Sequence, residues 1–276
     1  MKICYNQATT MLRSTLEEDL KYCEKYGYDF IEMRIDKLKD YLTRHSPEEL
    51  AAFFTKSRLK PLAFNGLEEF NYRSPEDFES IKRDMELCCS LSDLIGCKML
   101  TMDPSCGAGR LTVSQIKEDT KRTVLELLEY TDRFGMKLAF EFCGAPACCV
   151  NTYGQAYELV KEVNSANFGI ILDFFHFHAM GSKLEDLRAS DPAKIFMVHI
   201  DDAEDYPLGQ LTDGDRVWPG DGVIDTGGIM EALLDIGFDG VYSLELFRPE
   251  YWEMDTEDVI RIGLEKTVAL LKKFCK

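Results

Sequence analysis

Four side chains that could bind a metal ion each end a short apolar run in the second half of the chain. They are Glu141, Asp173, His199 and Glu245. Three buried carboxylates that converge without a cation repel one another and are costly to remove from water, and a divalent ion resolves both problems. Two Glu, one Asp and one His form an oxygen-rich donor set that suits Mn²⁺, Mg²⁺ or Co²⁺, with Zn²⁺ also accepted. We therefore predict that these four residues hold one divalent metal ion. The alternative for any one of them is a cap or a loop charge.

Three further residues follow the same runs and could contact a substrate. His176 comes three residues after Asp173, close enough to turn back toward the metal ligands. Arg216 lies in a loop rich in Gly and Pro, where it could hold a substrate oxygen through two donors or pair with neighbouring aspartates. Trp218 could form an apolar wall for a ring substrate or cap the core. We predict His176, Arg216 and Trp218 as substrate-binding residues.

A repeated pattern of helix, glycine and strand would position these groups. Gly27, Gly96, Gly135 and Gly237 each stand between a helical segment and an apolar run. Glycine takes the left-handed conformation that ends a helix, and tight connections then start a strand within a few residues. Helix starts are indicated by capping boxes, Ser14 with Glu17 and Ser46 with Glu49, and long helices are expected over 114–134 and from about 256.

The fold class follows from eight short apolar runs that alternate with these helices. Such alternation predicts parallel βα units, and eight of them in 276 residues fit a closed (β/α)8 TIM barrel, an α/β fold, as a single domain over 1–276. A Rossmann fold would need a glycine-rich fingerprint after the first strand, and residues 6–10 contain none. The runs centre near Ile3, Ile31, Leu62, Leu100, Ala139, Ile171, Met197 and Leu244. Because catalytic groups of such barrels lie at the carboxyl ends of the strands, the four metal-competent residues should meet at one rim.

Composition argues against several classes of protein. The formal net charge of −17 disfavours binding to nucleic acids and to acidic membrane surfaces. No stretch approaches the ~20 apolar residues of a membrane span, and the first residues show no signal-peptide pattern, so we expect a cytoplasmic protein. The sequence leaves association into homo-oligomers open. The ten cysteines are scattered without a C-x-x-C motif, and we expect reduced thiols, mostly small core residues.

Nearly the whole chain, and most strongly the part from about residue 137 onward, resembles the xylose-isomerase-like TIM-barrel sugar isomerases and epimerases. The order Glu, Asp, His, Glu on the last four predicted strands carries this resemblance, together with the runs 173–182, 199–202, 215–220 and 245–251. Within that family these runs are most similar to those of the 2-keto-myo-inositol (inosose) isomerases of inositol catabolism. The loop 103–109 departs from that pattern and could alter the substrate.

The resemblance implies a metal-dependent isomerase that interconverts keto-inositols, 2-keto-myo-inositol to 1-keto-D-chiro-inositol, through a cis-enediolate. Glu141 and Glu245 would be the catalytic acid and base, and the substrate a small polyol ketone or sugar. Which of the two acts first is not decided.

Other activities of the same superfamily are alternatives to this reading. They are a ketose 3-epimerase, another sugar or sugar-phosphate isomerase or epimerase, and an inosose dehydratase. A free-ketose epimerase is disfavoured because 144–148 offers no carboxylate shortly after Glu141. An apurinic-site endonuclease would need more histidines and a basic face. A sugar-binding barrel without turnover would not need paired carboxylates.

Overall fold

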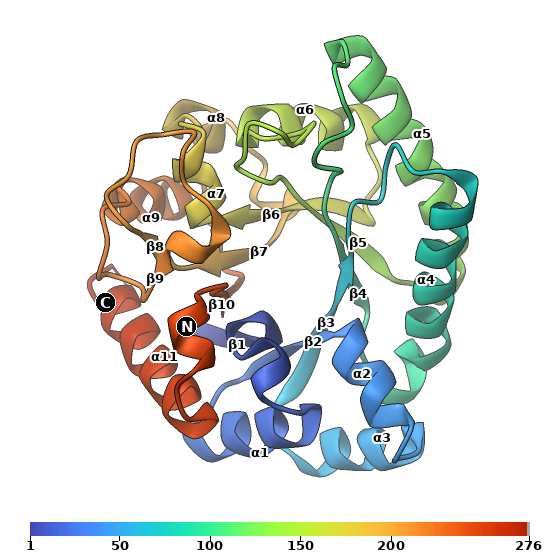
Figure 1. Cartoon of the computed structure of the whole chain (residues 1–276), viewed down its shortest axis with the longest axis vertical. Coiled ribbons are helices and arrows are strands. Elements are labelled where there is room, and N and C mark those ends of the chain that lie inside the picture. The colour runs from blue at the N-terminus through green and yellow to red at the C-terminus, as the bar shows by residue number, and fades with distance from the viewer. Residues whose placement is uncertain (275–276) are drawn as a thin grey trace.

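Eight parallel strands close into a barrel in the computed structural model, which describes residues 1–274 (Figure 1). Around the barrel the strands follow the order β1-β10-β7-β6-β5-β4-β3-β2, and β1 closes the ring by pairing with both β10 and β2. The predicted (β/α)8 architecture is confirmed, and each predicted run centre falls in a barrel strand. The strands are β1 (Lys2–Asn6), β2 (Phe30–Arg34), β3 (Lys60–Leu67), β4 (Met99–Met102), β5 (Lys137–Glu141), β6 (Phe168–Asp173), β7 (Ile195–Ile200) and β10 (Val241–Leu244).

Helices surround this barrel and bury their apolar faces against it (Figure 1). The connection after β7 carries a small antiparallel pair, β8 (Asp202–Ala203) with β9 (Arg216–Val217). Inside the barrel, four side chains from β3, β5, β6 and β7 form a separate small apolar cluster: Ala63, Ala139, Ile171 and Met197. The helices are α1 (Leu16–Tyr26), α2 (Ile35–Leu42), α3 (Pro47–Lys56), α4 (Pro75–Ile95), α5 (Val113–Thr131), α6 (Tyr153–Val163), α7 (Phe174–Ala179), α8 (Leu184–Arg188), α9 (Thr226–Asp235), α10 (Pro249–Trp252) and α11 (Thr256–Leu271).

The glycines predicted to end helices do so in the left-handed conformation. The four, at 27, 96, 135 and 237, have φ between 61° and 99°. The capping box of Ser46 with Glu49 is confirmed, but the predicted box of Ser14 with Glu17 is wrong by one residue. Thr15 caps α1 with Glu18, because the hydroxyl of Ser14 instead donates a hydrogen bond to the buried Asp19.

The expectation that all cysteines are reduced thiols is wrong for one pair. A disulfide joins Cys106, in the segment between β4 and α5, to Cys148, in the segment between β5 and α6. Sequence spacing could not indicate this pair, because its members are 42 residues apart and only the pairing of β4 with β5 brings their loops together.

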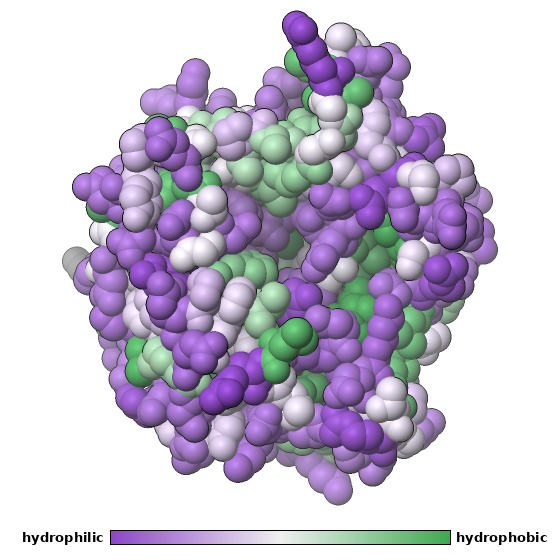
Figure 2. Space-filling model, in the orientation of Figure 1, coloured by the Kyte–Doolittle hydropathy of each residue, from purple (hydrophilic) through white to green (hydrophobic). Residues whose placement is uncertain are grey.

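The face of the molecule seen in Figure 2 is mainly hydrophilic and has a recess near its centre. This recess offers access to the barrel through polar surroundings.

Within residues 1–274, no helix combines the length and the apolar character needed to cross a membrane.

Candidate metal and active site

The four predicted metal ligands meet at the carboxyl ends of their strands. Glu141 and Asp173 end β5 and β6, His199 lies near the end of β7, and Glu245 directly follows β10. One potential ligand atom from each lies within 4.8 Å of the others. The Nδ1 atom of His199 is central, at 2.8 Å from Glu141 Oε1, 3.0 Å from Glu245 Oε2 and 3.8 Å from Asp173 Oδ2. The predicted convergence of these four side chains is confirmed.

The charges of this cluster are those of a cation site. Burial alone would lower the pKa of His199, but Glu141, Glu245 and Glu32 outweigh it and raise that pKa well above its usual value. Burial likewise raises the pKa of Glu141 well above its usual value, against the lowering effect of His199 and with a raising contribution from Glu245. A protonated imidazole therefore balances the carboxylates without a metal. A divalent ion that displaces this proton would find one nitrogen and three carboxylate donors, a set that fits Mn²⁺, Co²⁺, Zn²⁺ or Mg²⁺.

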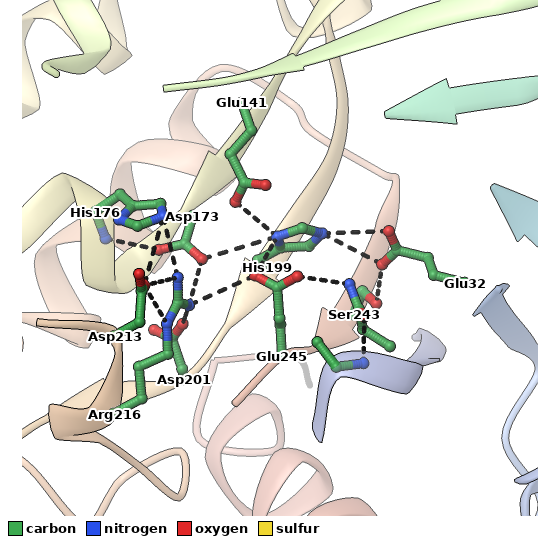
Figure 3. A network of polar contacts seen from close by, with 12 residues as sticks. Glu32, Glu141, Asp173, His176, His199, Asp201, Asp213, Arg216, Ser243 and Glu245 are labelled. Atoms are coloured by element: carbon green, nitrogen blue, oxygen red, sulfur yellow. Dashed lines mark hydrogen bonds and ion pairs between the residues drawn. The ribbon is translucent and has the colours of Figure 1, made fainter. Parts of the chain in front are cut away.

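Glu32 orients the histidine from the opposite side, a role that our sequence reasoning missed. Its carboxylate oxygens lie 3.2 and 3.4 Å from Nε2 of His199, and it accepts a short hydrogen bond from Ser243 (Figure 3). Glu32 is fully buried in the middle of β2. A carboxylate on Nε2–H leaves Nδ1 free to face the other donors, which is the usual arrangement around histidine ligands of metals. The available signal was a charged residue inside the apolar run of β2.

Arg216 lies behind the metal cluster and is fully buried. Its Nη1 donates to Asp173 Oδ2 at 2.6 Å and makes a short bond to Asp201. Burial would raise the pKa of Asp173, yet Arg216, followed by His176 and His199, lowers it to about 2. Arg216 therefore keeps Asp173 ionised and fixes one of its oxygens.

His176 presents an unused hydrogen-bond donor beside the cluster. Its Nε2 lies 3.1 Å from Nη2 of Arg216, and because guanidinium only donates, Nε2 accepts. Burial, assisted by Arg216 and opposed by Asp173, lowers the pKa of His176, so the ring is neutral and carries its hydrogen on Nδ1. Among the described residues, this buried Nδ1 has no hydrogen-bond partner.

A cavity of about 190 Å³ opens beside these groups. Of the four metal-competent residues, Glu141 and Glu245 line it, whereas Asp173 and His199 are fully buried. Figure 3 shows the two glutamates reaching His199 from opposite sides. The complete lining is Arg34, Asn65, Glu68, Thr101, Met102, Asp103, Glu141, Cys143, His176, Asp213, Glu245 and Phe247.

The three predicted substrate-binding residues are placed differently from one another. His176 lines the cavity. Arg216 contacts the cluster from behind, and the ring of Trp218 stacks on Tyr251 with centroids 4.2 Å apart. Contact of Arg216 and Trp218 with a substrate stays a prediction.

Asn6, another residue missed by sequence reasoning, donates to Glu245 Oε1 at 2.7 Å and so holds one of the two glutamates that face the cavity.

The fold is that of a known family. The xylose isomerase-like TIM barrel family matches residues 20–271, and the chain belongs to it. Two relatives that match over the full length carry a more specific name. An inosose isomerase of Bacillus licheniformis is 46% identical over 281 residues, covering all of both chains, and one of Bacillus subtilis is 44% identical over 275 residues, covering 99% of each. A crystal structure of the IOLI protein with a bound zinc atom is 44% identical, with a TM-score of 0.97 over all of both chains.

Proposed function

We propose that this chain is an inosose isomerase, a metal-dependent enzyme that converts 2-keto-myo-inositol to 1-keto-D-chiro-inositol by moving a proton between adjacent carbons. The observation that carries this proposal is the pair of opposed glutamates. Of the four clustered donors, only Glu141 and Glu245 face the cavity. Proton transfer at two neighbouring carbons needs one group to take a proton and a group to return it, and two opposed carboxylates provide both. Full-length relatives with this name support the same reaction class.

One divalent ion would be held by Glu141, Asp173, His199 and Glu245. The candidate ions are Zn²⁺, Mn²⁺, Co²⁺ and Mg²⁺. When bound, the ion supplies Lewis-acid stabilisation of negative charge that develops on the substrate. Glu141 and Glu245 would take the proton from the hydroxyl-bearing carbon next to the ketone and return a proton to the former ketone carbon through an enediolate, while the hydroxyl proton passes to the former ketone oxygen. Asp173 and His199, which are fully buried, act only as holders of the ion.

His176 would contact a substrate from the wall of the cavity, which it lines. Its Nε2 accepts from Arg216, and its buried Nδ1–H would reach a substrate hydroxyl or ketone after the ring turns toward the cavity. Arg216 would act chiefly through His176 and Asp173. Trp218, which lies outside the cavity lining, would act indirectly by supporting the rim through its stacking on Tyr251.

The test is proton exchange followed by NMR. Metal-loaded protein is incubated with 2-keto-myo-inositol in D₂O, and the carbon-bound protons of substrate and product are recorded. We expect a new keto-inositol isomer, deuterium next to the ketone, and loss of both after treatment with a chelator. Glu141→Gln and Glu245→Gln serve as matched inactive variants.

A chain that retains its metal yet gives neither exchange nor product would refute the inosose assignment. Ketoses offered to the same sample then identify an epimerase by conversion at the carbon beside the ketone. Release of water from the inosose, seen as a new unsaturated product, would identify a dehydratase instead.

A further inference from the structure

Three cysteine sulfurs lie together at the rim of the barrel, apart from the cluster of Glu141, Asp173, His199 and Glu245. Cys106 and Cys148 share the disulfide, and Cys143 is a free thiol. All three sulfurs lie within 4.8 Å of one another. Cys143 also lines the cavity. The three residues, which we call the thiol cluster, therefore join two loops to the wall of the active site.

Backbone hydrogen bonds hold these loops together independently of the disulfide. Gly107 N donates to Ala147 O at 2.9 Å, and Cys149 N donates to Ser105 O at 3.1 Å, so that Cys106 and Cys148 form an antiparallel bridge. Asn71 further anchors the first loop by accepting from Ser105 N at 2.8 Å. Because these contacts use no sulfur atoms, the three sulfurs should stay close when the disulfide is reduced.

We propose that the reduced thiol cluster is a second metal site, one that takes a thiophilic divalent ion of the zinc class. A small dithiol transfers two electrons and two protons to the Cys106–Cys148 bond and closes its own disulfide, leaving three protein thiols. Each thiol that binds the ion releases its proton to solvent. The oxidised protein, with two of the three sulfurs bonded to each other, lacks this site.

The spacing of the sulfurs matches this chemistry. A Zn–S bond is about 2.3 Å, so two sulfurs on one ion lie at most ~4.6 Å apart. Cys106 and Cys148 are bonded in the oxidised protein and Cys143 lies within 4.8 Å of both, so reduction would free two sulfurs beside a third that needs only a small movement to share an ion with them. The donors also separate the two sites by ion preference. Thiolates select soft ions, whereas the cluster of three carboxylates and one histidine accepts hard ions such as Mn²⁺ and Mg²⁺.

The experiment uses Cd²⁺ as a thiophilic probe on the full chain. The protein is reduced with a dithiol, freed of it by anaerobic gel filtration, and supplied with excess Mn²⁺ to occupy the oxygen-rich site. Cd²⁺ is then titrated while the ultraviolet sulfur-to-cadmium charge-transfer band is recorded. Cys143→Ser and Cys148→Ser each remove one sulfur. Cys149→Ser is the matched control, because its sulfur is partly buried beside Asn71 and outside the cluster.

We expect the band to saturate at one Cd²⁺ per reduced chain, for the natural protein and for Cys149→Ser alike. Oxidised protein should show little band, and Cys143→Ser and Cys148→Ser should bind Cd²⁺ at least tenfold more weakly. Retention of Mn²⁺ and an unchanged circular dichroism spectrum show that each variant is folded; if Cys148→Ser is not, Cys143→Ser decides. A reduced chain without the band, or a folded Cys143→Ser that binds Cd²⁺ like the natural protein, overturns the proposal.

Discussion

Replacing Glu32 by Gln tests how much the metal site depends on the residue behind His199. The carboxylate of Glu32 lies 3.2 Å from Nε2 of the imidazole, and both side chains are fully buried. Gln keeps the size and one acceptor but removes the negative charge that makes the imidazole a stronger ligand. Loss of such a partner costs about 10- to 100-fold in metal affinity, or ~1.4–2.8 kcal/mol.

The effect should depend on pH in a defined direction. Glu32 also contributes to the raised pKa of His199, so its removal makes the competing proton easier to displace. At acidic pH the easier loss of this proton partly compensates for the lower metal affinity of the imidazole. At alkaline pH, where the imidazole of the metal-free protein is neutral, no proton competes and the full loss should be visible.

Competition with a chromogenic chelator measures the dissociation constant of Zn²⁺ or Mn²⁺ at several pH values. Glu48→Gln, at an exposed position of α3, is the control for a change of one charge. A Glu32→Gln protein that binds metal within twofold of the natural protein at alkaline pH would refute the proposed role of Glu32.

Three further outcomes follow from the site. Glu141→Gln or Glu245→Gln should lower kcat by about 10²- to 10⁴-fold while the melting temperature of the metal-free protein does not fall, and near-normal turnover would contradict their acid–base roles. Metal uptake should release a proton from His199, detected by calorimetry in buffers of different ionisation enthalpy; the same heat in all buffers would contradict it. Burial raises the pKa of Asp103 from 3.8 to about 8. Between these two pH values the carboxyl group of Asp103 keeps its proton in the folded metal-free protein and has lost it in the unfolded chain. The stability of the metal-free protein should fall as pH rises from about 4 to about 8, by at most ~1.4 kcal/mol per pH unit for this group, and urea titrations should show a weaker pH dependence in Asp103→Asn.

Much of the fold could be predicted because each strand and each helix end has a local signal. Buried parallel strands appear as short apolar runs, and the glycines at 27, 96, 135 and 237 end helices for a conformational reason that depends only on neighbouring residues. Glu141, Asp173, His199 and Glu245 could be found because each adjoins such a run, and the barrel topology then requires that their strand ends meet.

Other parts of the site depend on contacts that no local pattern contains. Glu32 and His199 are 167 residues apart, and they meet only because closure of the barrel through β1 and β10 brings β2 near β7. The Cys106–Cys148 pair likewise needs the adjacency of β4 and β5. The cap of α1 moved from Ser14 to Thr15 because a buried carboxylate competes for the serine hydroxyl.

The cavity wall has consequences for how members of such a family can diverge. All four metal-competent side chains come from the ends of the last four barrel strands. Part of the cavity wall instead comes from the ends of β2, β3 and β4, with Arg34, Asn65, Glu68 and Asp103. Mutations in the first half can therefore reshape the wall that meets a substrate and leave the donors intact. Recombinants that join the first half of one relative to the second half of another should inherit metal chemistry from the latter, whereas both halves should shape substrate preference, because His176, Asp213 and Phe247 also line the cavity. Glu32 and Asn6 are exceptions, because they lie in the first half yet contact His199 and Glu245, and both would have to be kept in every such exchange.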